Sequence, residues 1–341
     1  MQEYNLQPDG TTPSFIHLDE INTMSILDAA LDYCRRGFIV TPLHEKRPIL
    51  ECWQERNLGA ADLPRNFRDG RNIGIVLGGP VGIVDVDLDN PLAIAASDLL
   101  LPKTVQSGRL RRLWSHYWYL CDPVPTTRKY TLPKVMAARL KVEPGEAMLA
   151  ELRSTGHQTV VAPSIHPVDG DRYLWHPGEI CEIEGVVLAG LVLDVAVAAL
   201  LALNRPVGSR AWFLIHAFGF LCPRLGPERA EKIVEGASAH FDDEEHDERM
   251  LAVRSFLRRP VDDDAPMMEG LLAAELERLA PGVPNLICRW CARDRREGGG
   301  RGEPGRRHHP LRQGGRQALP LTRRNRLRRR RGRRPPRDPR H

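Results

Sequence analysis

The chain has 341 residues and a net charge of +5, from 49 Lys and Arg against 44 Asp and Glu. Residues 281–341 contain 20 Arg, no Lys and 4 acidic residues, which leaves 29 basic and 40 acidic residues in the preceding 280. The acidic body and the arginine-rich tail therefore need separate interpretations. The composition argues against a membrane protein, since the longest apolar stretch, 185–203, contains Asp194 and is a poor membrane span.

The start of the chain is polar and has no signal-peptide pattern, and seven scattered Cys are typical of a reducing compartment. We therefore expect a cytoplasmic protein with no membrane partner. Residues 1–24 predict a flexible arm. Helical periodicity then predicts a helix over 26–36, capped by Ser25 and ended by Gly37.

Short apolar runs between turn residues predict strands in the next part of the chain. They cover residues 38–42, 72–77, 81–89, 115–120, 147–153, 159–162 and 173–175. A helix is expected over 92–101, a basic loop over 107–112, and the strands 147–153 and 159–162 are expected to pair through the turn 154–157. Strands and helices alternate without a regular βαβ rhythm, which favours an α+β domain, 25–188, over a doubly wound sheet.

Helical periodicity dominates after residue 188. Helices are predicted over 192–203, 210–221, 227–240, 244–258 and 268–279. We interpret residues 189–284 as a small all-α bundle domain. Residues 285–341 are interpreted as an Arg-rich disordered tail, either a nucleic-acid-binding segment or the translation of a GC-rich gene in a shifted reading frame. Twenty Arg without a Lys is the pattern that a frameshift would produce.

Asp85-Val86-Asp87 is the sharpest local motif. Residues i and i+2 of a strand point to the same face, so both carboxylates would project together between apolar neighbours. Close carboxylates repel unless a cation lies between them, and Mg²⁺ is commonly bound by one or two carboxylates together with phosphate oxygens. The motif therefore predicts a metal site, although an edge strand with solvated acids would show the same pattern.

Further polar side chains could complete such a site. Glu151 lies in an apolar strand, where an unpaired acid is unfavourable, and would be either a third metal ligand or a salt-bridge partner of Arg153. His116 follows the basic loop, and its imidazole beside guanidinium and hydroxyl groups suits a triphosphate. Those neighbouring groups belong to Arg109, Arg111, Arg112 and Ser115.

Two loops have ambiguous interpretations. Pro163 and Pro167 would hold a rigid turn that presents Ser164 and His166, which could equally be structural. The pair Lys46–Arg47 is either a solvated basic loop or a nucleic-acid contact.

Seven short segments in this order resemble the bifunctional DNA primase/polymerase N-terminal domain of plasmids, phages and integrated elements, within the archaeo-eukaryotic primase superfamily. The segments are Gly37–Leu43 with Lys46–Pro48, Asn72–Ile75 with Gly78, Val84–Asp87, Leu101–Thr104 with Gly108–Arg109, Ser115–Tyr119, Glu151–Pro167 and Tyr173–Trp175. The resemblance covers about residues 25–185. It implies an α+β domain whose catalytic sheet is similar to a modified RNA-recognition motif.

The resemblance also implies roles for individual residues. Asp85, Asp87 and Glu151 would be catalytic residues and ligands of Mg²⁺ or Mn²⁺, and His116 would contact the incoming nucleoside triphosphate. Nucleotide binding is expected at Arg109, Ser115, Arg153, Ser164 and His166, and nucleic-acid binding at Lys46, Arg47, Arg111 and Arg112. Two positions depart from the family pattern: Trp114 stands where a small residue is frequent, and Glu151 where Asp is common.

We therefore expect template-directed nucleotidyl transfer on a single-stranded DNA template, in a replicative or mobile element. The bundle looks like the one that joins such domains to a ring helicase, and because no Walker-type motif is present, a replicative helicase is expected as a separate partner. An inactive single-strand-binding remnant of a primase-helicase and a D-x-D glycosyltransferase are the alternatives.

Overall fold

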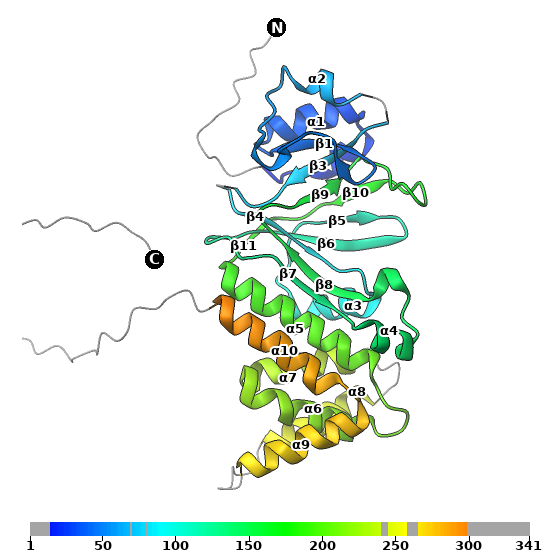
Figure 1. The fold of residues 1–341 in the computed structure, drawn as a ribbon, viewed down its shortest axis with the longest axis vertical. Helices are drawn as coiled ribbons and strands as arrows, with labels where there is room; N and C mark the ends of the chain where they lie inside the picture. Colours follow the sequence, from blue (N-terminus) through cyan, green and yellow to red (C-terminus); the bar gives the residue numbers. More distant parts are fainter. Residues whose placement is uncertain (1–13, 69, 80, 240–244, 258–264, 299–341) are drawn as a thin grey trace, which may run out of the picture. The chain divides into compact units, whose positions relative to one another are not determined.

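The computed structural model describes residues 14–298 except 69, 80, 240–244 and 258–264. These residues lie in one compact unit, Met1–Gly300. Within them, strands form two sheets and are followed by a series of helices (Figure 1). The α+β class expected from the sequence is confirmed.

The smaller sheet has the strand order β2-β1-β3-β9 and lies against helix α1. Its strands are β1 (Val40–His44), β2 (Arg47–Pro48), β3 (Asn72–Val76) and β9 (Gln158–Val161). The larger sheet has the order β10-β5-β6-β4-β8-β7, with β11 paired to β6. Its strands are β4 (Ile83–Asp87), β5 (Gln106–Arg109), β6 (Arg112–Leu120), β7 (Arg128–Thr131), β8 (Met148–Arg153), β10 (Tyr173–His176) and β11 (Cys181–Glu182).

The helices in the described part of the chain fall into two groups. Those inserted among the strands are α1 (Ile26–Arg35), α2 (Leu63–Asn66), α3 (Pro91–Leu100) and α4 (Lys134–Leu140), with short 3₁₀ turns at Leu18–Thr23, Trp53–Glu55 and Pro144–Glu146. Those that follow the strands are α5 (Gly185–Leu203), α6 (Arg210–Leu225), α7 (Pro227–Ser238), α8 (His246–Leu257), α9 (Ala265–Leu279) and α10 (Val283–Gly298). The Ser25 hydroxyl accepts a hydrogen bond from the Asp28 amide, as expected of the N-cap of α1.

The central strand β4 separates two hydrophobic cores. Val84 and Val86 point to the face that α3, α4 and α5 cover, and the core there continues into the later helices. By the same alternation, Ile83, Asp85 and Asp87 point to the opposite face, where Ile83 joins a second core. The smaller sheet and α1 lie on that side of the larger sheet (Figure 1). The strict alternation along β4 therefore places its carboxylates between the two sheets.

Helix α5 is long and apolar enough to cross a membrane by length and composition. In the structure, 78% of that stretch is buried inside the protein, against β8, α3, α7 and α10. Its apolar character is thus explained by its position at the centre of a core. Within the core, Asp194 on α5 pairs with Arg229 on α7.

Two local predictions were wrong. The basic segment expected as a loop contains strand β5, which pairs with β6 across a bulge between Ser107 and Arg109. The strands β8 and β9 do not pair with each other, because each belongs to a different sheet. Their connection lies against the turn after β3, where a Cβ at Gly78 would be 2.2 Å from the Thr155 hydroxyl oxygen. The chain therefore crosses from one sheet to the other at this turn.

Helical structure extends beyond residue 284, where we placed the start of the tail. Val283, Ile287 and Trp290 lie on a buried stripe of α10 at helical spacing. Trp290 packs edge-on against Tyr130 of β7, with 5.4 Å between ring centroids. The apolar spacing explains this helix, although the arginines around it dominate the composition. Residues 299–341, the greater part of the expected tail, and residues 1–13 of the expected arm lie outside the described residues.

Candidate active site

Carboxylates from two neighbouring strands lie together on the face of the larger sheet that meets the smaller sheet. Asp87 of β4 is directly opposite Glu151 of β8, and Asp85 is opposite Arg153. On the other side, Asp87 is opposite His116 of β6. Their side chains are nearly inaccessible, with 0% of Asp85, 5% of Asp87 and 9% of Glu151 exposed. Strand register therefore brings together the three acids that the sequence predicted as a group.

Asp85 lies deepest, and two side chains lie within hydrogen-bond distance of it. Thr159 of β9 donates a hydrogen bond to its Oδ2 at 2.6 Å, and His116 Nδ1 lies 3.0 Å from the same oxygen. Burial alone would raise the pKa of Asp85, but the charges of His116 and Arg153 outweigh it and hold that pKa below its ordinary value. Asp85 is therefore ionised in the folded protein.

His116 responds in the opposite sense. Burial alone would lower the pKa of His116, but the carboxylates of Asp85 and Asp87 outweigh it and raise that pKa. For Asp87, burial raises the pKa above its ordinary value, against the opposing charges of Arg153 and His116. The site thus favours a cationic imidazole between two carboxyl groups, a suitable donor for an anionic ligand.

Arg153 contacts all three carboxylates. It pairs with Oδ2 of Asp87, its Nε donates to Oε2 of Glu151 at 3.1 Å, and its Nη1 lies 3.8 Å from Oδ2 of Asp85. Lys129 of β7 adds a weaker contact to Glu151, at 3.5 Å. The three carboxylates therefore face a common point, and in this structure a guanidinium lies there.

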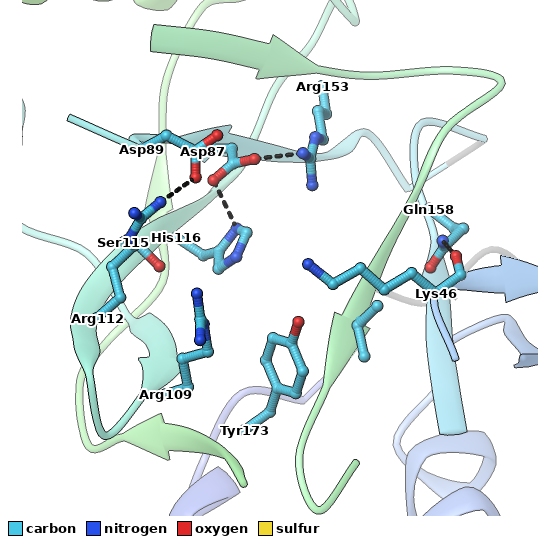
Figure 2. Close-up of a pocket in the computed structure, with 11 residues that line it drawn as sticks. Lys46, Asp87, Asp89, Arg109, Arg112, Ser115, His116, Arg153, Gln158 and Tyr173 are labelled. Carbon is cyan, nitrogen blue, oxygen red and sulfur yellow. Dashed lines mark hydrogen bonds and ion pairs between the residues drawn. The ribbon is translucent and has the colours of Figure 1, made fainter. Parts of the chain in front are cut away.

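A cavity of about 270 Å³ lies beside this cluster and is bordered by Asp87 and Arg153 (Figure 2). Asp85 and Glu151 do not line it. It is lined by Lys46, Asp87, Asp89, Arg109, Arg112, Ser115, His116, Arg153, Gln158, Val160 and Tyr173. Acidic groups lie near β4, while cationic side chains reach in from β5, β6, β8 and the hairpin between β1 and β2 (Figure 2). Such an arrangement suits an anionic ligand bound beside a carboxylate cluster.

The smaller sheet holds Lys46 at the cavity. Gln158 of β9 donates a hydrogen bond to the Lys46 carbonyl at 3.0 Å. The Gln158 side chain lies across β3 at Gly74, where a Cβ would be 2.3 Å from its Oε1. Gly74 therefore leaves the space that the Gln158 side chain needs to hold this hairpin.

Arg109 is fixed at the opposite wall. Its guanidinium pairs with Asp169, and its Nη1 lies 3.4 Å from Nδ1 of His166. His166 is in turn 2.7 Å from Asp169, so these three residues form one cluster. Burial, reinforced by the charges of Lys46 and Arg109, lowers the pKa of His166. Burial also raises the pKa of Tyr173 to about 12, which keeps its hydroxyl neutral beside the cavity.

The structure brings only part of the predicted set to the cavity. Arg112 and Ser115 line it, and Arg112 Nη1 donates to Asp89 at 2.7 Å. His166 does not line it, but contacts Arg109 and Tyr173, which do. Ser164 is fully buried and accepts a hydrogen bond from the Ile73 amide at 2.8 Å, and it does not line the cavity. Arg47 is exposed on β2 and the Arg111 side chain is 72% exposed, so both lie outside the cavity.

Trp114 does not obstruct the cavity. Its φ of 61° is left-handed, a conformation that favours glycine and explains why a small residue suits this position. The Trp114 ring packs on His176, and His176 is opposite Gln106 of β5 in the strand register. His116 is opposite Ser107, the next residue of β5, and neighbouring residues of a strand point to opposite faces. The Trp114 ring therefore lies on the reverse face of the sheet from His116.

Several residues around the site were not predicted. They are Thr159, Gln158, Lys129, Asp169 and Tyr173. Their roles depend on which strands are neighbours and on the crossing of the chain between sheets. The alternation in β9 could have indicated that Gln158 and Val160 share a face, but not that this face meets the cavity.

The carboxylates agree in chemistry with a divalent cation, since hard cations are bound by oxygen atoms and these three acids face one positive group. With Arg153 at that point, however, no group of three His, Cys, Asp or Glu side chains in the described residues is arranged to hold a metal ion. The three acids thus have the ligand atoms that a divalent cation prefers, and in this structure they contact the Arg153 guanidinium.

Residues 30–186 match the model of one protein family, described as bifunctional DNA primase/polymerase, N-terminal. The matched segment contains both sheets and every residue that lines the cavity. This part of the chain is similar to the Prim-Pol family. A search of curated proteins finds no match to the chain. At the level of the family, the Prim-Pol domain is a DNA primase/polymerase domain, whose chemistry is nucleotidyl transfer.

Proposed function

We propose that the cavity between the two sheets is the active centre of a template-directed DNA primase/polymerase. The observation that carries the proposal is the meeting of two charge environments in one cavity: carboxylates of β4 beside cationic groups from four other segments (Figure 2). Nucleotidyl transfer needs both, because a hydroxyl must be activated while the charge of a triphosphate is neutralised.

The cationic wall would bind the nucleoside triphosphate. Arg109 and Arg112 supply permanent positive charge, and Lys46 adds an amine whose pKa is lowered by burial. His116 adds a ring N–H donor, and the neighbouring acids raise its pKa. Ser115 contributes a hydroxyl at the same wall. These groups would orient the phosphates so that the reacting phosphorus lies over the carboxylates.

Asp85, Asp87 and Glu151 would bind Mg²⁺ or Mn²⁺, since the carboxylates have the oxygen donors that these ions prefer. The bound cations supply Lewis-acid activation of the attacking 3′-hydroxyl and neutralise charge on the leaving pyrophosphate. Thr159 and His116 keep Asp85 ionised and fixed in orientation. The chain's own contribution is therefore to position these oxygens and to exclude water from the deepest carboxylate.

Single-stranded DNA is the proposed template. Lys46 and Arg47 on the smaller sheet and Arg111 at the tip of the β5–β6 hairpin are basic groups beside the cavity or near it, where they would contact backbone phosphates. We further propose that the protein acts in replication of a plasmid, phage or related element, in the cytoplasm, with a helicase supplied by another chain.

A primer-extension assay tests the function. The full chain is mixed with a primed single-stranded DNA template, labelled nucleoside triphosphates and Mn²⁺ or Mg²⁺. Asp87→Asn should reduce incorporation about 100-fold or more. Asp98→Asn, on the exposed side of α3, is the control and should not change it. Wild-type incorporation by Asp87→Asn would overturn the assignment.

The same assay separates the alternative of an inactive remnant. Such a protein would retain affinity for the oligonucleotide and incorporate no label under any metal. A glycosyltransferase is not supported, because the sheets are built from antiparallel pairs apart from β11 with β6.

A further inference from the structure

Arg153 occupies the point that a catalytic cation would need. It is opposite Asp85 in the strand register and two residues after Glu151, so its side chain emerges on the carboxylate face. The side chain is 24% exposed and lines the cavity, whereas Asp85 and Asp87 beneath it are almost fully buried. Arg153 therefore lies between the cavity and the deepest carboxylates.

The carboxylate oxygens that face Arg153 already have polar partners within the protein. Oδ2 of Asp87 and Oε2 of Glu151 contact its guanidinium, and Oδ2 of Asp85 accepts from Thr159. An arginine is a permanent cation with fixed N–H geometry, and it cannot yield these oxygens by losing a proton. A divalent cation at the same carboxylates would be repelled by the guanidinium and would compete for the same lone pairs.

The charge balance of the cluster also implies that a divalent cation competes with the Arg153 guanidinium. Three carboxylates confined within a buried cluster repel one another and need positive charge nearby. Arg153 and Lys129 provide it in the described structure. A divalent cation that binds these carboxylates therefore has to displace one of these groups. Arg153 is the one that both contacts all three acids and borders the cavity.

We propose that Arg153 is a positioning residue that holds Asp85, Asp87 and Glu151 together before the metal arrives and releases them when it binds. The released guanidinium would remain at the cavity it already lines, where the triphosphate of the substrate supplies new acceptors. The inference rests on the proposed function, because it takes the same carboxylates as the metal site. It predicts that Arg153 opposes metal binding while supporting the metal-free fold.

Metal affinity of the full chain, measured without nucleotide, is the direct test. Free Mn²⁺ is followed by electron paramagnetic resonance during titration of wild type, Arg153→Gln and Arg112→Gln. Arg112 is a matched control, since it lines the same cavity but pairs with Asp89. Arg153→Gln should lower the Kd for Mn²⁺ about tenfold or more, and Arg112→Gln about threefold or less. An equal or weaker affinity in Arg153→Gln than in Arg112→Gln would overturn the proposal.

Thermal unfolding gives the second readout. Arg153→Gln should melt below wild type in a chelator and should gain more in melting temperature from saturating Mn²⁺ than wild type does. If Arg153→Gln does not fold in the chelator, Arg153→Lys replaces it, since a single ammonium contacts fewer carboxylate oxygens. The Mn²⁺ affinity of Arg153→Lys should then exceed that of wild type, and an unchanged or weaker affinity contradicts the proposal.

The variant Asp87→Asn distinguishes a failure of the proposed metal site from a failure of the proposed role of Arg153. If Asp87→Asn binds Mn²⁺ as tightly as wild type, these carboxylates are not the metal site, and the proposed metal chemistry fails along with the role of Arg153. If Asp87→Asn binds Mn²⁺ more weakly than wild type while Arg153→Gln does not bind it more tightly, only the proposed role of Arg153 fails.

Discussion

At the scale of single residues, Thr159 supports the most deeply buried charge of the site. Its hydroxyl donates at 2.6 Å to Asp85, whose side chain is 0% exposed. Thr159→Val keeps the shape and removes the donor, so one lone pair of a buried carboxylate is left without its partner. We expect the free energy of unfolding to fall by about 1.5–3 kcal/mol, measured by urea denaturation at neutral pH.

Thr131→Val is the control for that change. Thr131 is an exposed strand threonine on β7, so its substitution should alter stability by less than about 0.5 kcal/mol. Equal effects of the two substitutions would show that the Thr159 hydroxyl contributes no more than an ordinary surface group.

Asp194, on α5 and outside the candidate active site, gives the folded protein a pH-dependent stability. Burial raises the pKa of Asp194 to about 6, although Arg229 donates two hydrogen bonds to it, at 3.0 and 2.6 Å. The unfolded chain has an ordinary pKa near ~3.9, so between the two values the folded protein binds the additional proton. The contribution of this proton on Asp194 to the stability of the folded protein is complete below about pH 4 and is lost as the pH rises through about 6.

The comparison with Asp194→Asn isolates this effect. Asparagine does not titrate, so the stability of wild type relative to the variant should fall by about 3 kcal/mol from about pH 3.5 to 7. Urea denaturation at a series of pH values measures it. Parallel profiles for the two proteins would mean that Asp194 keeps an ordinary pKa.

The acids of the site could be predicted at this scale, but their partners could not. Asp85 and Asp87 follow from alternation in an apolar strand, and Glu151 from an acid placed in another. Arg153 was expected either to pair with Glu151 or to bind nucleotide. Its contact with all three carboxylates depends on the register between β4 and β8. The sequence of a single strand does not determine its register with a neighbouring strand.

At the scale of elements, the β1–β2 hairpin depends on a glycine in a different strand. Gly74→Ala would place a methyl group 2.3 Å from Gln158 Oε1 and 3.2 Å from Leu43 Cδ2. The Gln158 side chain would have to move and release the Lys46 carbonyl. We expect the affinity for a nucleoside triphosphate to fall about fivefold, the equivalent of one hydrogen bond, when measured by titration calorimetry.

Gly145→Ala serves as the control, because a Cβ there meets no atom within 4 Å. It should leave nucleotide affinity unchanged. A Gly74→Ala variant with wild-type affinity would show that the Gln158 contact does not position Lys46.

Elements with a strong periodic pattern were predicted well, and those whose identity depends on a partner were not. Strand β4 and helix α1 agree with the sequence to within a few residues. Strand β5 contains Gly108 and Ser107 and has no apolar run; it forms because it pairs with both β6 and β10. The turn between β8 and β9 has the length of a hairpin, yet β9 pairs with β3 in the other sheet, and Thr155 of that turn lies against Gly78.

At the scale of the whole molecule, the Prim-Pol domain and the later helices share a hydrophobic core. Leu149 and Leu152 of the larger sheet belong to the same buried cluster as Leu193 of α5, Phe213 of α6 and Ile287 of α10. The family match ends at residue 186, just after α5 begins. The boundary of the family is therefore not a boundary of the core.

A truncated chain tests whether the helices are required for folding. A chain that ends at residue 186 would uncover the apolar face of β8 that α5 packs against, where Ala150 and Leu152 are 0% exposed in the structure. Because a large exposed apolar face promotes aggregation, we expect this fragment to be insoluble or to lack a cooperative thermal transition. A chain that ends at residue 298 keeps α10 and should unfold cooperatively in the same calorimetric scan. A soluble fragment 1–186 with a single sharp transition would show instead that the two sheets fold without the later helices.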